Sequence, residues 1–501
     1  MPYRYQMNPA LLNDWGFLSI SPLAHWGFDA QTNFGISNFF YPHPTDNSKL
    51  ITFLDNSVSS KDFLNGIHRS NEIRFDMSFN ILSFGFFAWG GYNVFGIDFK
   101  NEFRFAIPKD LFAFLKNQMD NRNGTHYKIG GLQVRDDAYA VVSLGHARPL
   151  GFIDEKLTAG ATLKVLLGAA SAKAGPTDFD LYMSQDKWEV KLNYEAMISS
   201  VMKMNWETDK DGNVNGLGDM TFGGLGGFGL GIDLGATYQL LPELMLSAAI
   251  TDLGFIKWKN TLYAASNAQP FVFNGLEGIG GDGFKLEDQI NIDTFTNGLS
   301  QLRPGTGVGH TSYLNANLRL GAEYYVHKYI SFGLLSTTRF SGWGTMTELM
   351  ATANLKPKWF NLVLNAAISN WGPSWGLYLG WAPRYFVNMF LSVDYVPFSY
   401  TKMKDIPIPV PVNDISLSIN AGATIPLNRN KLRDKPEDMR SIGTMNMEGG
   451  TAMDWQQENN AKSAGTTKEV KRKVERSKSI DKLNKEEEKE VKRMTQPIEE
   501  E

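Results

Sequence analysis

The stretch at residues 71–81 is NEIRFDMSFNI, and from Glu72 to Ile81 it alternates polar and apolar side chains without a break. Its odd positions from Ile73 to Ile81 are apolar, and its even positions from Glu72 to Asn80 are polar. Side chains of a β-strand point alternately to opposite faces, so this stretch predicts a strand with one apolar and one polar face. Burying a charged side chain without a partner is costly, so the polar face must meet water or other charges.

The same alternation recurs through the first 427 residues. We place strands near residues 26–37, 72–86, 91–107, 133–147, 157–169, 178–184, 188–197, 227–240, 243–258, 313–326, 329–340, 345–356, 358–370, 374–383, 386–396 and 414–427. A soluble β-sandwich would also alternate, with its polar face outside. Three features favour instead a closed barrel that spans a membrane.

The first feature is strand length, since the segments at 72–86 and 91–107 span roughly 50 Å at about 3.3 Å per residue, well beyond ordinary globular strands. The second is the order of the connections along the chain. Every second connection is a tight turn, and several of the others are long loops, as in outer-membrane barrels. The third is that tryptophans lie at or near predicted strand ends, as in interfacial girdles. These are Trp258, Trp343, Trp359, Trp371, Trp375 and Trp381.

The sequence therefore predicts an all-β protein, a closed antiparallel transmembrane β-barrel of about 14 strands, with 16 as the alternative count. Closure leaves no unpaired strand edge in hydrocarbon, where each bare N–H or C=O would cost several kcal/mol. The odd face of 73–81 would meet lipid of the outer membrane, and the even face would meet a polar lumen.

Composition argues against several other classes. The chain has no cysteine, its seven histidines are scattered without metal-ligand spacing, and its net charge is −4. We expect no metal, no cofactor and no nucleic acid partner. No spacing singles out a nucleophile with its base, so we expect no catalytic residues and no enzyme. GLGGFG at 224–229 matches a dinucleotide pattern, but an alternating strand follows it where a helix would be needed.

The chain divides into three parts. Residues 1–25 are predicted as an N-terminal hatch or plug segment, 26–427 as the barrel, and 428–501 as a charged periplasmic tail. The tail holds 17 Lys/Arg and 16 Asp/Glu with one aromatic residue, so it is predicted to be largely disordered, with a helical stretch near 466–494. The first ten residues contain no signal peptide, so we expect a leader to have been removed or missed.

Three segments carry a resemblance to known proteins: NPALLNDWGFLSISPL (8–23), FRFAIPKDLFAFLK (103–116) and AAITDLGFIKW (248–258). Through them the chain resembles a Bacteroidetes outer-membrane barrel family of unknown function. The Asn-Pro-Ala at 8–10, followed by a large predicted barrel, more distantly resembles the FadL-type transporters of hydrophobic compounds. The resemblance implies that the N-terminal segment folds into the lumen, with Asn8, Pro9 and Ala10 as hatch residues. An ordinary Asx-Pro turn at these residues is the alternative.

Charged side chains gather on the polar faces of two strands that should be neighbours. The predicted lumen-lining residues are Glu72, Arg74, Asp76, Asp98, Lys100, Glu102 and Arg104. They predict either a ladder of cross-strand ion pairs or a selectivity patch. Residues 107–116 predict a short helix in the following loop, with Pro108 suited to its start.

Two functions remain open from the sequence. The first is a channel or transporter that passes a small hydrophobic ligand through the outer membrane, as the resemblance implies. The alternative is a structural or scaffolding barrel whose charged tail docks a periplasmic protein or contacts the cell wall.

Overall fold

The computed structural model describes most of the chain from Pro2 to Arg429. Not described within that range are residues 14, 47–48, 118–123, 152–155, 185–186, 267–270, 274–301, 306–308, 343, 358, 371, 383–386, 399, 402–409 and 412–413. The predicted tail from 430 onward, with its helical stretch at 466–494, lies outside the described residues. No helix among the described residues is long and apolar enough to cross a membrane.

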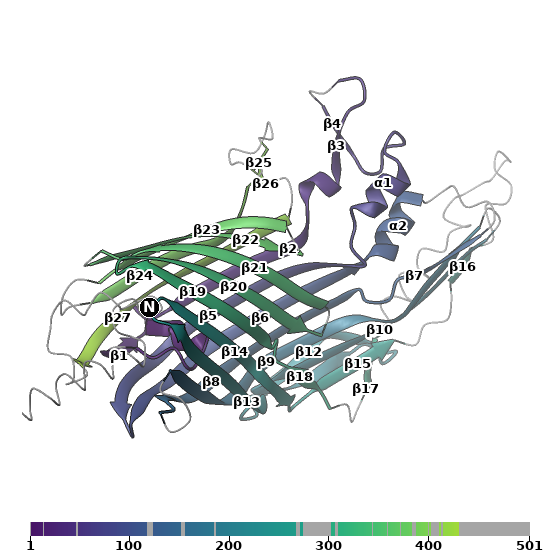
Figure 1. The fold of residues 1–501 in the computed structure, drawn as a ribbon. Helices are drawn as coiled ribbons and strands as arrows, with labels where there is room; N and C mark the ends of the chain where they lie inside the picture. Colours follow the sequence, from purple (N-terminus) through teal and green to yellow (C-terminus); the bar gives the residue numbers. More distant parts are fainter. Residues whose placement is uncertain are drawn as a thin grey trace, which may run out of the picture.

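A single tilted sheet closes on itself to form a barrel (Figure 1). In the described residues its wall contains 14 antiparallel strands, which confirms the predicted fold class. The wall strands are β2 (Trp26–Gly35), β5 (Ser70–Ala88), β6 (Gly91–Pro108), β8 (Gln133–Pro149), β9 (Leu157–Met183), β13 (Gly227–Leu241), β14 (Leu244–Trp258), β19 (Asn317–His327), β20 (Ile330–Ser341), β21 (Gly344–Leu355), β22 (Phe360–Ser369), β23 (Gly372–Trp381), β24 (Asn388–Pro397) and β27 (Asp414–Arg429).

The barrel closes where its first and last strands pair. Trp26 on β2 lies opposite Ala421 on β27, and β27 also pairs with β24. β1 (Trp15–Ile20) extends the same seam, because it pairs with both β27 and β5. The sequence placed residues 15–20 in the hatch, whereas the structure places them in the wall, since their backbone groups complete the hydrogen bonds between β27 and β5.

The wall contains two strands fewer than the sixteen segments placed from the sequence. Residues 157–169 and 178–184 form one strand, β9, which is 27 residues long. β10 (Trp188–Ser200) does not cross the wall, because it pairs only with the outer part of β9 and with short strands beyond it. β10 therefore lies at the long-loop end of the barrel and adds no strand to the wall.

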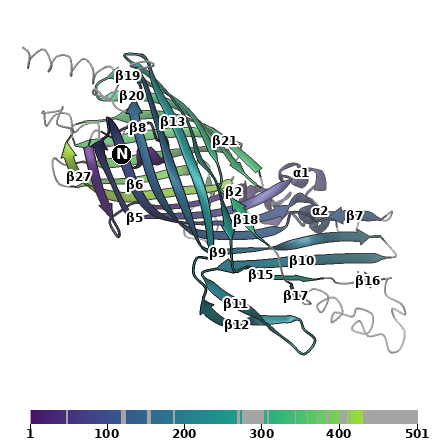
Figure 2. The same ribbon diagram turned by 90° about the horizontal axis from the view of Figure 1, so that it is seen from below.

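Long connections at one end of the barrel carry additional elements (Figures 1 and 2). These are η2 (Ile36–Asn38), β3 (Phe40–Pro42), β4 (Leu50–Thr52), α1 (Ser60–Asn65), α2 (Lys109–Asn117), β7 (Thr125–Lys128), β11 (Met202–Thr208), β12 (Val214–Phe222), β15 (Leu262–Ser266), β16 (Phe271–Phe273), β17 (Leu302–Gly305), β18 (Thr311–Tyr313), β25 (Tyr400–Thr401) and β26 (Val410–Pro411). Helix α2 begins directly after Pro108, within two residues of the start predicted for it.

A compact cap of aromatic side chains forms between α1 and α2 at this end. Phe63 is fully buried there, stacked on Phe53 with ring centroids 4.4 Å apart, and Phe112 of α2 packs against it. Ser59 accepts a hydrogen bond from the backbone of Asp62 and so caps the start of α1. The cap is held by apolar packing and lies beside the entrance to the lumen.

The outer surface of the wall is apolar. Large apolar side chains are exposed on every wall strand except β6, and the positions between them are buried or partly buried. The exposed residues include Phe28, Phe75, Leu144, Leu163, Leu230, Leu246, Leu320, Phe332, Leu349, Leu364, Trp375, Leu391 and Ile419. This alternation matches the predicted apolar face. Trp258 departs from the predicted girdle: it is buried against Tyr139 inside the barrel and donates a hydrogen bond to Ser312.

Candidate lumen site

The N-terminal segment, residues 2–13, lies inside the barrel near its short-turn end (Figure 1). It begins with a turn of 3-10 helix, η1 (Pro2–Gln6), whose Tyr3 and Tyr5 rings are buried. They pack in a cluster with Phe17, Tyr92, Val94 and Phe390 of the wall. The Tyr3 hydroxyl bonds the Ser19 hydroxyl and accepts from the backbone N–H of His25. This aromatic cluster fills the lumen at the short-turn end.

Asn8 bonds the N-terminal segment to the barrel wall. Its side-chain amide lies 3.3 Å from the carbonyl oxygens of both Ala236 on β13 and Ala248 on β14. Its side-chain oxygen accepts from the backbone N–H of Ala10 at 2.9 Å, which fixes the local turn. The Asn-Pro-Ala tripeptide therefore forms the Asx turn given as the alternative and also contacts the wall, while its role as a hatch stays a prediction.

Two wall glycines leave the room in which this tripeptide sits. A Cβ added to Gly160 on β9 would lie 2.5 Å from the backbone carbonyl carbon and oxygen of Pro9. A Cβ added to Gly235 on β13 would overlap the side-chain oxygen of Asn8. Since a strand interior has no conformational need for glycine, these positions serve close approach of the segment to the wall.

A lysine shared by two aspartates lies farther along the lumen from the short turns. The Lys164 ammonium is 2.7 Å from Asp233 and 2.8 Å from Asp252, and the Lys100 ammonium is 3.3 Å from Asp252. Lys100 stands on β6 and Asp252 on β14, so this pair spans several strands across the lumen. The predicted lumen residue Lys100 thus finds its partner outside the two strands first considered.

Asp252 reaches this cluster through a bulge in β14. Its φ is 58°, in the left-handed region, and the pairing with β13 shifts register next to it. As a result the side chains of Thr251 and Asp252 both face the lumen. Arg319 donates a hydrogen bond to the Thr251 hydroxyl at 2.8 Å, and Asp252 pairs with Lys164. A non-glycine residue in this region stores backbone strain of order 1 kcal/mol or more, which persists where its surroundings fix it.

The charged residues of neighbouring strands stand in rows of like sign. Arg74, Arg104 and Arg135 are directly opposite one another across β5, β6 and β8, and Asp76 is opposite Glu102. Like charges facing each other destabilise a sheet, so the ion pairs form diagonally or along one strand. Arg104 pairs with Asp76, Arg74 with Glu72, and Arg135 with Asp137. Of these pairs, Arg104 with Asp76 joins the two strands as the predicted ladder requires, on the diagonal, whereas Arg74 and Arg135 pair within their own strands.

Two contacts from these rows cross the lumen. Arg339 on β20 approaches Asp76 on β5 at 3.7 Å, and the Arg74 guanidinium lies 3.4 Å from the Ser341 hydroxyl at the end of β20. Strands β5 and β20 are separated by many strands around the wall, so these contacts narrow the passage. A charged constriction therefore lies near the long-loop end.

The remaining predicted lumen residues are held by neutral donors. Glu102 accepts from the Tyr139 hydroxyl and from the Asn315 amide, each at 2.6 Å. Asp98 accepts from the Asn80 amide at 2.8 Å. All seven predicted residues lie on inward positions of β5 and β6, and the structure joins them into the surrounding network.

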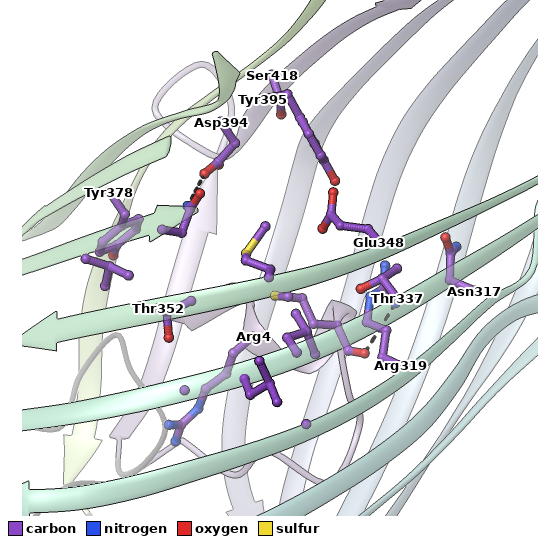
Figure 3. A pocket seen from close by; sticks show the side chains of 18 of the residues that line it. Arg4, Asn317, Arg319, Thr337, Glu348, Thr352, Tyr378, Asp394, Tyr395 and Ser418 are labelled. Atoms are coloured by element: carbon purple, nitrogen blue, oxygen red, sulfur yellow. Dashed lines mark hydrogen bonds between the residues drawn. The ribbon is translucent and has the colours of Figure 1, made fainter. Parts of the chain in front are cut away.

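Two cavities lie on either side of the constriction. The mouth cavity, about 600 Å³, lies at the long-loop end and is lined by residues that include His68, Arg69, Glu72 and Arg74. The lumen cavity, about 420 Å³, lies between the N-terminal segment and strands β19 to β24 (Figure 3). Its lining includes Arg4, Met7 and Leu11 of the N-terminal segment, so that segment forms part of the cavity wall.

Several lumen residues were not singled out from the sequence. They are Lys164, Asp233, Asp252, Arg319, Arg339 and Glu348. One signal was available: the tripeptide Asp-Leu-Gly occurs at 233–235 and again at 252–254, on strands that pair. Within the described residues no group of three or more His, Asp or Glu side chains is arranged to hold a metal ion.

Comparison with solved structures found barrels of low sequence identity. They include the Ralstonia pickettii toluene transporter TbuX, with 10% identity, 85% of this chain and 94% of that chain covered, and a TM-score of 0.41. A Pseudomonas aeruginosa FadL homologue has 10% identity, the same coverage and a TM-score of 0.39. The Pseudomonas putida toluene transporter TodX has 10% identity, coverage of 85% and 93%, and a TM-score of 0.37. No curated protein matches the sequence.

The match to a family model covers most of the barrel. It extends over residues 9–394, from the Asn-Pro-Ala segment to β24. The Bacteroidetes origin expected from the resemblance stays a prediction. The chain belongs to the family described as a family of unknown function, DUF5723.

Proposed function

We propose that the chain is an outer-membrane channel for small hydrophobic molecules in which residues 2–13 act as a hatch. One observation carries the proposal: a closed barrel with an apolar exterior encloses an N-terminal segment that obstructs its lumen. An apolar exterior of this extent is suited to hydrocarbon, and closure satisfies the strand backbone there. A barrel that served only as a scaffold would not need glycines at the wall positions where a separate segment packs closely.

The route we propose passes from the mouth cavity through the charged constriction into the lumen cavity. Apolar side chains of the lumen cavity, among them Leu335, Met346, Met350 and Val363, offer contact for a hydrophobic body. Met7 and Leu11 of the hatch complete that lining. A molecule in the cavity would therefore touch the hatch and could favour a displaced position of it, because a ligand shifts a conformational equilibrium by its differential contacts.

Removing the hatch tests the proposal. We expect deletion of residues 2–13 to raise single-channel conductance in planar bilayers severalfold, because the aromatic cluster at the short-turn end loses Tyr3 and Tyr5. The control is Gly151→Ala, because an added Cβ at Gly151 meets nothing within 4 Å. In cells, a strain lacking the gene should take up toluene or decanoate more slowly than the complemented strain. Equal uptake in both strains, with unchanged conductance of the deletion variant, would overturn the proposal.

A further inference from the structure

Glu348 presents a buried carboxylate oxygen to the lumen cavity. It points inward from β21 and is 3% exposed, and within the described part of the chain its Oε2 accepts no hydrogen bond. The Tyr395 side chain points toward the same carboxylate from β24 (Figure 3). A buried acceptor without a donor is unfavourable, and more so when it is charged. That free energy is recovered by any ligand that brings a donor to the oxygen.

Gln31 presents a second acceptor to the same cavity from β2. It is 4% exposed, and its Oε1 accepts no hydrogen bond among the described residues. Both free atoms are oxygen acceptors, so the cavity favours a ligand that donates N–H or O–H groups. Glu348 on β21 and Gln31 on β2 lie on strands that are not neighbours in the wall, and both residues line the lumen cavity.

The charges around the cavity favour a cationic donor. Asp29 and Asp394 line it together with Glu348, and the nearby Arg339 is already drawn toward Asp76 at 3.7 Å. Of the other lining cations, Arg319 donates to the Thr251 hydroxyl at 2.8 Å. The whole lining holds four carboxylates, those of Asp29, Glu323, Glu348 and Asp394, against the three guanidinium groups of Arg4, Arg319 and Arg339, so its formal charge is negative by one.

Tyr395 is held beside Glu348 by a strained backbone. Its φ is 60°, and the pairing of β23 with β24 shifts register at this level. Strict alternation would send Tyr395 outward next to an inward Asp394, yet both residues line the cavity. Strain of this kind is kept where the surroundings fix it, and such positions cluster at ligand sites.

We infer that the lumen cavity binds amphiphilic organic amines, with the ammonium group on Glu348 and the apolar body against Met346, Met350 and Val363. The inference rests on the proposed function, because it names the substrate class of the same cavity. An organic cation fits better than a metal ion, since the described residues offer no metal-ligand cluster here. The cavity of about 420 Å³ lies within the usual range for small-molecule sites of roughly 300–1,000 Å³.

Three probes with one body and different head groups test the inference by titration calorimetry on the full chain in detergent. They are 2-phenylethylammonium, 2-phenylethanol and phenylacetate. We expect the ammonium to bind tightest and phenylacetate weakest. Glu348→Gln should weaken ammonium binding about tenfold or more and change alcohol binding about twofold or less, because only the cation loses a charged partner. Glu207→Gln, on the exposed β11–β12 hairpin, is the charge-matched control and should bind as the parent does.

Equal affinity for the three head groups would overturn the inference, as would ammonium binding that Glu348→Gln leaves unchanged. If that variant does not fold, judged by heat-modifiable mobility on gels, Gln31→Leu takes its place and should weaken ammonium binding severalfold. Failure of the channel and failure of the amine site give different results. Amine binding without any uptake difference rejects only the channel, whereas uptake without head-group preference rejects only the amine site.

Discussion

Replacing Asp252 by asparagine should destabilise the barrel strongly, because Asp252 holds two lysines together in the lumen. Its carboxylate lies 2.8 Å from the Lys164 ammonium and 3.3 Å from that of Lys100. Asparagine keeps the size of the side chain and tolerates a φ of 58°, so the change removes charge and little else.

The expected loss in the free energy of unfolding depends on the interactions that each lysine retains. Removing one partner of a buried ion pair costs about 3–5 kcal/mol. Lys164 retains Asp233 at 2.7 Å, and the Lys100 side chain is 30% exposed and can recover some hydration. We therefore expect a loss near the lower bound, about 3 kcal/mol in the free energy of unfolding.

Equilibrium unfolding in urea, followed by tryptophan fluorescence in lipid vesicles, measures this loss. Asp211→Asn in the exposed β11–β12 turn is the control and should change stability by no more than about 0.5 kcal/mol. The double variant with Lys164→Met should lose less than the two single losses combined, because the residues share one network. A loss below about 1 kcal/mol for Asp252→Asn, or strict additivity, would refute the account of a coupled lumen cluster.

Three further changes test other parts of the molecule. Gly235→Ala should displace Asn8 and raise conductance above that of Gly151→Ala; equal conductance of the two variants would mean that Asn8 does not hold the hatch. Leu163→Arg, at an exposed site of the wall, should cost about 2–4 kcal/mol in vesicles if that site lies near the bilayer midplane, and no loss would place it outside hydrocarbon. Phe63→Ala should remove about 3–5 kcal/mol of packing from the cap, so limited proteolysis should cut there first while the barrel stays intact.

The fold was predictable because alternation has a direct structural cause. A strand between lipid and lumen must change polarity at every residue, so the pattern at 72–86 and 91–107 indicated β5 and β6 closely. β9 was divided in error between residues 169 and 178, a stretch that contains Gly175 and Pro176, residue types that often interrupt a strand. The structure continues the strand there, because β10 pairs with it beyond the wall and absorbs the irregularity in a register shift.

The lumen network was predictable only in part, since alternation says which residues face inward and not which of them meet. Arg74 and Arg104 were expected to find partners across β5 and β6, yet the register places them opposite each other. Arg104 pairs on the diagonal with Asp76, and Arg74 pairs along its own strand with Glu72. The contacts from Arg339 and Ser341 follow from closure of the whole barrel. Neither the register nor the closure can be read from one strand at a time.

Two of the breaks in alternation lie beside charged side chains of the lumen. Asp252 on β14 and Tyr395 on β24 have φ values of 58° and 60°, and each adds a second consecutive side chain to the interior. A wall under selection for stability alone would relax such positions, because a residue in the left-handed region costs about 1 kcal/mol or more and glycine would relieve it. Asp252 ties the lysines beside the hatch, and Tyr395 faces Glu348 in the lumen cavity. Strain at these two residues is therefore what we expect if the barrel uses the hatch and the binding cavity that we propose.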